Sequence, residues 1–500
     1  MWAMGIFVPG LVAFGFCLVV VQCTQAIRIA FDTHLARIPG PVLARFTGWT
    51  LKINTLMGQR TRYIHSLHQQ YGPVVRISPR EISLADADAV RQIHKIGTPF
   101  RKASWYKDLT QQPDDDKCTV FAIRDPRRAS ARRKLFQRSA TRAAVRQWEP
   151  VVVRLADLAV QKMKRDVVAG GTADVARWWS MMTADVLSLL AFGEAFHVVE
   201  TEQKPPLITD IEAALVLGAL RLELPWTWPL VRRIPLPSLG SPASLFARIR
   251  DYGSIAARNT NNSSRRGIKT LFSEMVPHDE QEQPLSDAVI ALESVNIIMA
   301  GGDTTATALT FLIYAVLRDP AVKEELVNEL ATCSGDPPSW DELDQLPFLR
   351  GVIQETLRLY APIPATLRRE VPPEGARLGG YTIPPGITVG TQAYTMHRDP
   401  EIWHHPERNP ILTTPITSFD PHRWASPTPE MKAAFMPFGG AARTCLGQNI
   451  ARLELLHATA RFFRECPRAV LSSRMTEGDM RMVDYFTGRP KGGRCEISMS

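Results

Sequence analysis

The longest helical pattern in the sequence covers residues 286–318 and constrains the fold more than any other feature. About 33 residues at a rise of about 1.5 Å each would run roughly 50 Å, across the width of a whole domain. The pair Asp319-Pro320 ends this helix and starts the next one. No internal repeat and no Gly/Ser-rich or Pro-rich linker interrupts the sequence around it, so we expect one large domain rather than a string of small ones.

Helical patterns also dominate the rest of the chain. Short strand signals lie at residues 74–78, 81–84, 381–383 and 388–389, the last two on either side of Pro384-Pro385-Gly386. With 45% hydrophobic and 22% charged residues, the chain is neither disordered nor fibrous. We therefore predict a mainly α fold with a small β-sheet region near the amino-terminal third. The helices are expected at residues 144–168, 175–192, 207–220, 243–260, 286–318, 320–332, 346–360 and 447–465.

The long helix contains a local conflict at Ala300-Gly301-Gly302-Asp303-Thr304-Thr305. Two glycines in a helix interior cost about 1 kcal/mol each relative to alanine, and Asp and Thr are poor helix formers as well. Such a conflict is expected at a functional site. A packing notch for a crossing helix explains it equally well, so this segment alone leaves both interpretations open.

A second motif surrounds Cys445. The sequence Phe438-Gly439-Gly440-Ala441-Ala442-Arg443-Thr444-Cys445-Leu446-Gly447 places this cysteine just before a predicted helix and behind a small-residue loop. Backbone N–H groups of the loop, the helix amino terminus and Arg443 all favour the thiolate, which suits a soft metal ligand. Four other cysteines are interpreted as buried apolar residues. They are Cys118, Cys333, Cys466 and Cys495.

Together the two motifs resemble those of the cytochrome P-450 family of haem-thiolate monooxygenases. The cysteine loop of that family reads Phe-Gly-x-Gly-x-Arg-x-Cys-x-Gly, and here only its second glycine differs, where Ala441 adds one methyl group. The long helix matches the family's oxygen-activation motif Ala-Gly-x-Asp-Thr-Thr in full. The resemblance implies a cytochrome P-450 fold.

The same resemblance implies a haem b whose iron takes Cys445 as its axial thiolate, so that Cys445 is the metal ligand. It implies that Asp303 and Thr304 orient water and relay protons to dioxygen, the co-substrate. Further residues implied to contact the cofactor are Ala300, Phe438, Gly439, Arg443 and Gly447.

The family's Glu-x-x-Arg motif falls on Glu355 and Arg358, in the predicted helix 346–360. The same spacing recurs at Glu374/Arg377 and Glu465/Arg468, and an isolated surface pair of this kind contributes only roughly a few tenths of a kcal/mol. Downstream, residues 419–424 resemble the family's Phe-x-Pro-Glu-Arg-Phe/Trp, with His422 in place of the glutamate. The resemblance implies a buried structural network that holds the cysteine loop. Its members would be Glu355, Arg358 and Arg423.

Arg133, Arg369 and Arg443 are candidates for the haem propionates, because guanidinium forks pair well with carboxylates. Arg133 follows the family pattern only in part, since Ala129 occupies an aromatic position. The basic residues around Arg133 form either a solvated helix face or, as we favour, a docking face for an acidic reductase. These residues are Arg127, Arg128, Arg132, Lys134 and Arg138.

No GxGxxG or P-loop motif is present to bind NADPH. Electrons from NADPH are therefore expected through a separate flavoprotein, NADPH-cytochrome P-450 reductase, with cytochrome b5 as a further candidate donor. Two rival functions stay open: a reductase-independent haem-thiolate isomerase or dehydratase, and a non-catalytic haem sensor.

A lipophilic small molecule is the expected substrate, because Glu293 is the only charged residue between Asp287 and Asp303. The resemblance places Ile363, Pro364, Ala365 and Phe486 in the substrate pocket. Sequence details at residues 71–79 and 398–403 resemble fungal microsomal members that tailor secondary metabolites. The reaction would be hydroxylation, epoxidation or multi-step oxidation of a polyketide, a terpenoid or an alkaloid.

The first 27 residues contain no charged side chain, and residues 6–21 are almost continuously apolar. We expect a transmembrane anchor at 1–27, a basic, Pro-rich hinge at 28–45 and one haem-thiolate catalytic domain at 46–500. Cationic residues after the anchor place this domain on the cytosolic side of the endoplasmic reticulum membrane. A cleaved signal peptide is the alternative, in which case the sequons at Asn261 and Asn262 could be glycosylated.

Residues 222–241 combine Trp226 and Trp228 with Arg232 and Arg233. This combination predicts a segment that dips into the membrane surface, although an ordinary Pro-rich loop explains it nearly as well. The net charge of +9 favours an acidic partner or anionic lipid, and no long basic block supports nucleic-acid binding.

Overall fold

The computed structural model describes most of the chain after residue 27. The described residues are 20–21, 24–25, 27–112, 114–115, 117–203, 206–235, 240–266, 270–272, 285–403 and 417–499. They form two compact units: unit 1 combines Met1–Ala103 with Thr366–Gln392, and unit 2 combines Ser104–Ala365 with Ala393–Ser500. The mainly α fold with small sheets is confirmed. The expected anchor lies almost wholly outside the described residues, and the single domain at 46–500 stays a prediction.

Unit 1 is built on a five-stranded sheet with strand order β1-β2-β8-β5-β3. Strands β1 (Val74–Ser78) and β2 (Glu81–Leu84) form an antiparallel pair at the two positions that the sequence predicts. Strand β8 (Thr388–Gln392) lies parallel to β2 and antiparallel to β5 (Thr366–Glu370), and β3 (Arg101–Lys102) is the edge strand. The unit also contains the helices α2 (Trp49–Leu56), α3 (Arg60–Tyr71) and α4 (Ala87–His94).

The two strand signals around Pro384-Pro385-Gly386 do not pair with each other. Strand β7 (Tyr381–Ile383) instead pairs with β6 (Ala376–Leu378), which the strand signals missed. The two prolines have no N–H to donate to a ladder. Gly386, with a φ of 73°, then turns the chain so that its N–H donates to the Val371 carbonyl, and β8 joins the larger sheet.

Unit 2 is mainly helical, and each of the eight predicted helices is present in it. Its centre is α14 (Asp287–Leu317), which Ser286 caps by accepting a hydrogen bond from the Val289 N–H. The other seven are α8 (Glu149–Gly170), α9 (Val175–Phe192), α11 (Pro206–Glu223), α13 (Pro242–Arg266), α15 (Pro320–Leu330), α17 (Pro347–Leu359) and α21 (Gln448–Glu465). The unit also contains two small sheets. One consists of β4 (Ala173–Asp174), β12 (Glu496–Met499) and β9 (Ala469–Leu471), and the other of β10 (Met482–Asp484) and β11 (Gly488–Pro490).

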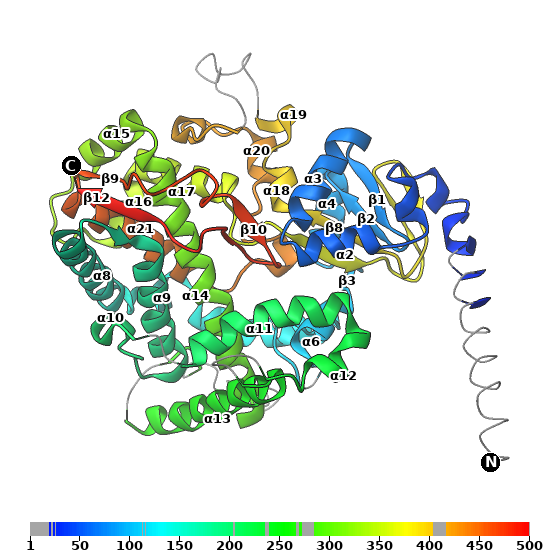
Figure 1. Ribbon diagram of the computed structural model, residues 1–500, viewed down its shortest axis with the longest axis horizontal. Coiled ribbons are helices and arrows are strands. Elements are labelled where there is room, and N and C mark those ends of the chain that lie inside the picture. Colours follow the sequence, from blue (N-terminus) through cyan, green and yellow to red (C-terminus); the bar gives the residue numbers. More distant parts are fainter. Residues whose placement is uncertain are drawn as a thin grey trace. The chain divides into compact units, whose positions relative to one another are not determined.

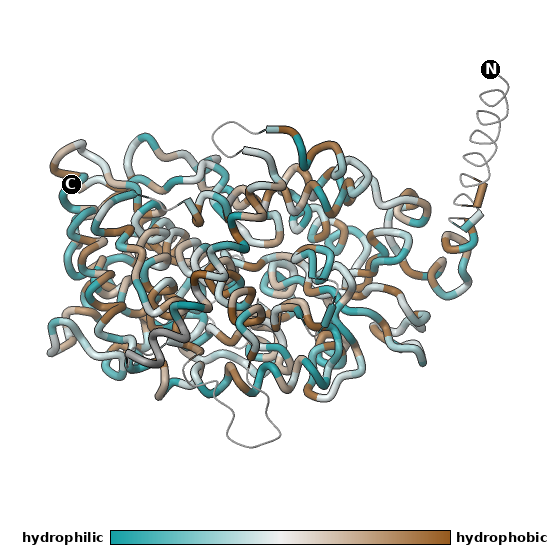
Figure 2. The backbone as a smooth tube through the Cα atoms, turned by 90° about the horizontal axis from the view of Figure 1, so that it is seen from below, coloured by the Kyte–Doolittle hydropathy of each residue, from teal (hydrophilic) through white to brown (hydrophobic). Residues whose placement is uncertain are grey.

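Helix α14 contacts α9, α13 and α21, so it lies in the core of unit 2 (Figure 1). Among the described residues it is the one helix long and apolar enough to cross a membrane. More than half of its apolar stretch is buried inside the protein, as expected of a core helix. Hydrophobic and hydrophilic residues alternate along the backbone of the protein (Figure 2).

Helix α6 (Pro126–Ser139) was missed as an element because it buries only four of its residues and so has little apolar periodicity. Its start signal is present, since the Asp125 carboxylate accepts the Arg128 N–H and Pro126 occupies the first turn. This helix supplies Arg133, which donates to the Thr444 carbonyl next to Cys445, as described below.

Candidate active site

The loop from Met436 to Gly447 holds Cys445 by its own backbone hydrogen bonds. The Gly439 N–H donates to the Met436 carbonyl at 3.0 Å, and the Cys445 N–H donates to the Phe438 carbonyl at 2.8 Å. Gly439 has a φ of 82°, a left-handed conformation that favours glycine. The loop is thus folded back on itself before α21 begins at Gln448.

Ala441, which departs from the family's glycine, is accommodated without strain. It begins a short 3-10 turn, η5 (Ala441–Arg443), and has no positive φ. The Arg443 N–H donates to the Gly440 carbonyl at 2.9 Å and closes this turn. The extra methyl group is exposed, so it leaves the geometry of the loop intact.

Cys445 is the one exposed cysteine among the described residues, and the other four described cysteines are buried. Surrounding protein atoms desolvate its thiol and raise its pKa, while the Gly447 N–H and the charge of Arg133 favour the thiolate. Arg133, on α6, donates from Nη2 to the Thr444 carbonyl at 2.6 Å. Two groups that stabilise an anion therefore surround this sulfur.

Glu355, Arg358 and Arg423 meet in the interior of unit 2, and all three side chains are fully buried. Arg358 makes a bidentate pair with Glu355, with Nε to Oε2 at 2.8 Å and Nη2 to Oε1 at 2.7 Å. Arg423 Nε lies 3.4 Å from Glu355 Oε1. Burial would raise the pKa of Glu355, but the charges and hydrogen bonds of the two arginines hold it below its ordinary value.

One further side chain and two backbone groups contribute to this network, which a local sequence pattern does not show. The Trp424 Nε1–H donates to Glu355 Oε2 at 3.0 Å, and the Asp420 N–H donates to Oε1 at 3.1 Å. Arg358 Nη1 also donates to the His397 carbonyl at 2.9 Å. His422 lies outside the network, half exposed beside Glu325.

Gly301 of α14 forms a packing notch for a side chain of α9. A Cβ at Gly301 would lie 2.8 Å from Leu187 Cδ1, so an alanine there would force this leucine side chain to shift. The Thr183 hydroxyl of α9 donates to the Gly302 carbonyl at 2.9 Å. The notch interpretation is therefore correct for Gly301, whereas a Cβ at Gly302 would make only an ordinary contact, 3.9 Å from Leu187 Cδ1. A notch at Gly301 is compatible with a functional role for the Asp303-Thr304 pair that follows.

Thr304 has a defined hydrogen-bonding state. Its hydroxyl donates to the Ala300 carbonyl at 2.8 Å. Because a hydroxyl has one hydrogen, Oγ1 can act toward a further partner only as an acceptor. Asp303 and Thr304 are both half-buried. The next residue, Thr305, faces the other way and is buried against Glu454 of α21.

The three propionate candidates fall in two places. Arg133 and Arg443 both lie in unit 2. The charge of Arg133 interacts with Cys445, and Arg443 precedes Cys445 by two residues. Arg369 lies in β5 of unit 1, where it is buried and donates to the Arg368 carbonyl. The structure thus groups two of the three, and the role of Arg369 stays a prediction.

The residues expected to line a substrate pocket lie on two adjoining segments. Pro364 and Ala365 are buried and Ile363 is half-buried, and the Gly488 N–H donates to the carbonyl of neighbouring Pro362 at 2.8 Å. Phe486, in the turn between β10 (Met482–Asp484) and β11 (Gly488–Pro490), has a φ of 97°, which costs a non-glycine residue about 1–3 kcal/mol.

Phe486 contacts two half-buried rings that the sequence analysis missed. Its ring centroid lies 5.1 Å from that of Trp105 and 5.8 Å from that of Phe121. Trp105 begins α5 (Trp105–Thr110), and Arg221 of α11 donates to the Leu109 carbonyl at its end, at 2.8 Å. These half-buried rings therefore lie next to a contact between α5 and α11.

The carboxylate of Glu293 is paired within the protein, so it adds no unpaired charge to the predicted substrate pocket. Its carboxylate is fully buried, accepts the Val120 N–H at 2.7 Å and pairs with Arg132 Nη1 of α6 at 3.1 Å. One carboxylate of α14 thereby holds both the loop that bears Phe121 and the basic helix α6.

Comparison with known proteins identifies the family. The model of the family described as Cytochrome P450 matches residues 38–482. The chain belongs to the cytochrome P450 family. It is 36% identical over 96% of its length to the cytochrome P450 monooxygenase tazI of Aspergillus terreus, covering 97% of that protein. It is also 36% identical to stcB of Emericella nidulans, with 95% and 91% covered, and 32% identical to the methylphloroacetophenone oxidase of Cladonia uncialis, with 77% and 86% covered.

These relatives are fungal, and those named tazI and stcB are cytochrome P450 monooxygenases, so the resemblance and the predicted enzyme class are both confirmed. The residues present fit the haem of this family. A sulfur flanked by an N–H donor and a guanidinium is a suitable thiolate ligand, and Arg133 and Arg443 supply cations for carboxylates.

Proposed function

We propose that this cytochrome P450 inserts one oxygen atom of dioxygen into a lipophilic small molecule of fungal secondary metabolism, as a membrane-anchored, NADPH-dependent haem-thiolate monooxygenase. The observation that carries the proposal is the setting of Cys445. Among the cysteines that the structure describes it is the exposed one, it ends a small-residue loop, and both Gly447 and Arg133 favour its anion.

Cys445 would ligate the haem iron, and Arg133, Arg443 and Arg369 would pair with its propionates. The haem, when bound, supplies dioxygen activation, and a thiolate ligand favours cleavage of the O–O bond. The Glu355/Arg358/Arg423 network holds the segments that lead into the cysteine loop. Thr304 offers an acceptor oxygen, since its proton is held by the Ala300 carbonyl, and Asp303 beside it is the proton donor or acceptor through water.

Electrons would arrive from NADPH-cytochrome P450 reductase at the outer face of α6, with cytochrome b5 as a second donor. Arg127, Arg128 and Lys134 are exposed on this helix. Arg132 and Arg133 of the same helix face inward to Glu293 and Thr444. A cationic face toward solvent steers an acidic partner, and its effect falls with ionic strength.

The substrate side is lipophilic. Phe486, Trp105 and Phe121 present half-buried rings, and the charge of Glu293 is paired. Aromatic rings favour offset or edge contacts with another ring, so an aromatic substrate is the best match. The name of one relative, a methylphloroacetophenone oxidase, states an aromatic ketone as the compound on which that protein acts.

The enzyme would lie on the endoplasmic reticulum membrane, anchored by residues 1–27. Trp226 and Leu230, in the segment 222–241, of which the structure describes 222–235 and 240–241, are each 71% exposed. Trp228 instead packs against Phe246, with ring centroids 6.0 Å apart. Exposed apolar side chains beside Arg232 and Arg233 suit a lipid headgroup surface. Removing residues 1–27 should leave residual vesicle binding that a Trp226→Glu/Leu230→Glu change abolishes and a Trp228→Phe change does not.

The decisive experiment is the carbon monoxide difference spectrum of the reduced protein. We expect a thiolate-type Soret band for the wild type and for Cys333→Ala, a buried cysteine used as a matched control. Cys445→Ala should lose the band, and retention of it would refute the ligand assignment. Deleting the gene and identifying the compound that accumulates would then give the substrate, to be turned over with reductase and NADPH.

A further inference from the structure

His397 lies outside every motif and is completely buried just after α18 (Ala393–Met396). Both of its ring nitrogens are hydrogen-bonded. The Met436 N–H donates to Nε2 at 2.9 Å, and Nδ1 lies 3.0 Å from the Arg358 carbonyl. A backbone N–H can only donate, so Nε2 is the acceptor. Nδ1 therefore carries the hydrogen and donates to Arg358, which fixes one neutral tautomer.

The surroundings of the ring keep it neutral. Burial lowers the pKa of His397 to about 3, and the nearby cations Arg358 and Arg398 also disfavour the imidazolium. The ring packs against Phe435 and Trp403, with centroids 5.3 and 6.1 Å away. A protonated ring could not accept the Met436 N–H, so the hydrogen bonds and the neutral state require each other.

The two hydrogen-bond partners of the His397 ring lie at the end of α17 and at the start of the cysteine loop. The Arg358 carbonyl is in the last turn of α17, where carbonyls have no partner within the helix. The guanidinium of the same residue binds Glu355 and donates to the His397 carbonyl. Met436 starts the cysteine loop, and its own carbonyl accepts the Gly439 N–H. The ring thus spans the gap between the glutamate–arginine network and the loop of the thiolate.

We propose that His397 is a positioning residue for the thiolate ligand, which ties the start of the cysteine loop to the carboxyl end of α17. This inference rests on the proposed haem-thiolate function. The bond to Met436 orients the loop, and the bond to Arg358 orients the ring. Loss of the loop bond should let Cys445 leave the iron or take up a proton more readily.

The test replaces one hydrogen bond at a time. His397→Gln places an amide oxygen near Nε2 and keeps an acceptor for Met436, whereas His397→Asn places its amide near Nδ1 and keeps only the bond to Arg358. The readouts are the fraction of thiolate-type band in the carbon monoxide spectrum, its rate of loss under mild heating, and the melting temperature. We expect about tenfold faster loss of the band in His397→Asn than in His397→Gln, as the loss of one buried hydrogen bond predicts.

Trp178→Phe is the control, because it removes one partly buried hydrogen bond of a fully buried side chain, from Nε1 to Asp166 at 2.9 Å, away from the network. It should lower the melting temperature without increasing the non-thiolate band. Equal rates of band loss in His397→Asn and His397→Gln would overturn the proposal, as would an equal effect of Trp178→Phe. If wild type lacks the thiolate band, the proposed function itself fails, which is a different result.

Discussion

The buried carboxyl of Glu454 allows a quantitative test of the structure. Glu454 lies in α21, is 1% exposed, and forms a side-chain hydrogen bond with Thr305 of α14. Its Oε1 has no hydrogen-bond partner among the described residues. Burial raises its pKa from 4.5 to about 8, and the Thr305 hydrogen bond opposes the rise only in part. The folded protein therefore holds this carboxyl protonated at neutral pH.

The perturbation is Glu454→Gln, which keeps an acceptor for Thr305 and cannot ionise. The pKa of Glu454 is higher in the folded protein than in the unfolded chain. Its contribution to the free energy of unfolding is therefore fully present below about pH 4.5 and is lost progressively up to about pH 8. From about pH 5 to about pH 7.5 the loss amounts to about 3 kcal/mol, at 1.36 kcal/mol per pKa unit. Glutamine removes this loss.

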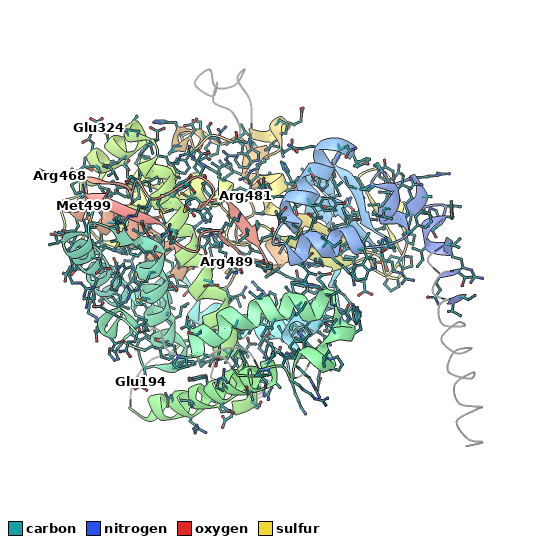
Figure 3. All side chains as sticks on the ribbon, in the orientation of Figure 1. Glu194, Glu324, Arg468, Arg481, Arg489 and Met499 are labelled. Carbon is teal, nitrogen blue, oxygen red and sulfur yellow. The ribbon has the colours of Figure 1, made fainter. Side chains whose placement is uncertain are left out.

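The assay is thermal unfolding of the haem-loaded protein at both pH values. Unfolding entropies of about 2.1 cal/mol/K per residue give, for roughly 460 residues, about 1 kcal/mol per degree. The melting temperature of Glu454→Gln minus that of wild type should therefore be about 3 °C higher at about pH 7.5 than at about pH 5. The control is Glu324→Gln, at an exposed position on the outer side of α15 (Figure 3).

Any destabilisation that the glutamine amide causes equally at both pH values cancels when the two melting-temperature differences are subtracted. Only the pH-dependent part of the difference therefore tests the pKa of Glu454. Parallel melting curves of wild type and Glu454→Gln across the range would refute the reasoning. They would show that Glu454 ionises in the folded protein at its ordinary pKa, and that the packing of α21 against α14 leaves room for solvent or a counter-charge.

Three further changes have expected outcomes. Glu355→Gln leaves the buried Arg358 without its counter-charge, so it should cost about 3–5 kcal/mol and abolish soluble, haem-loaded protein, measured by expression and Soret absorbance. Gly301→Ala should lose about 1–3 kcal/mol by overpacking against Leu187, of which the better helix propensity of alanine offsets about 1 kcal/mol. Adding Leu187→Ala should recover part of the loss in a double-mutant thermal-unfolding cycle. Arg133→Gln should speed haem transfer to apomyoglobin by at least about tenfold, because a charged hydrogen-bond partner contributes about 1.5–3 kcal/mol; an unchanged rate would contradict the propionate role.

Much of the local structure could be predicted from the sequence because its causes are local. The apolar pattern at residues 175–192 coincides with α9, and Asp319-Pro320 marks the boundary before α15. Strand pairing is decided by distant partners, so the sequence predicted β8 as a strand but not its place between β2 and β5. Helix α6 was missed because its residues are mostly polar and exposed.

The residues of the candidate site divide in the same way, into those found from local motifs and those that depend on distant contacts. Cys445, Glu355 and Arg358 were found because short motifs contain them. His397 and Trp424 act through contacts to residues 39 and 69 positions away, which no local spacing encodes. The glycine pair of α14 could be interpreted in two ways until Leu187 was located against it.

The ion pair of Glu293 has a consequence for attempts to change the substrate range of this enzyme. Residues around Val120 and Phe121 are natural targets for such libraries, yet the Val120 N–H and Arg132 share one carboxylate. A library member that shifts this loop also loosens the helix proposed to receive electrons. Under the proposed function, variants selected for a new substrate would therefore lose coupling efficiency, consuming NADPH without forming product. Screens should record NADPH consumption and product formation for each variant.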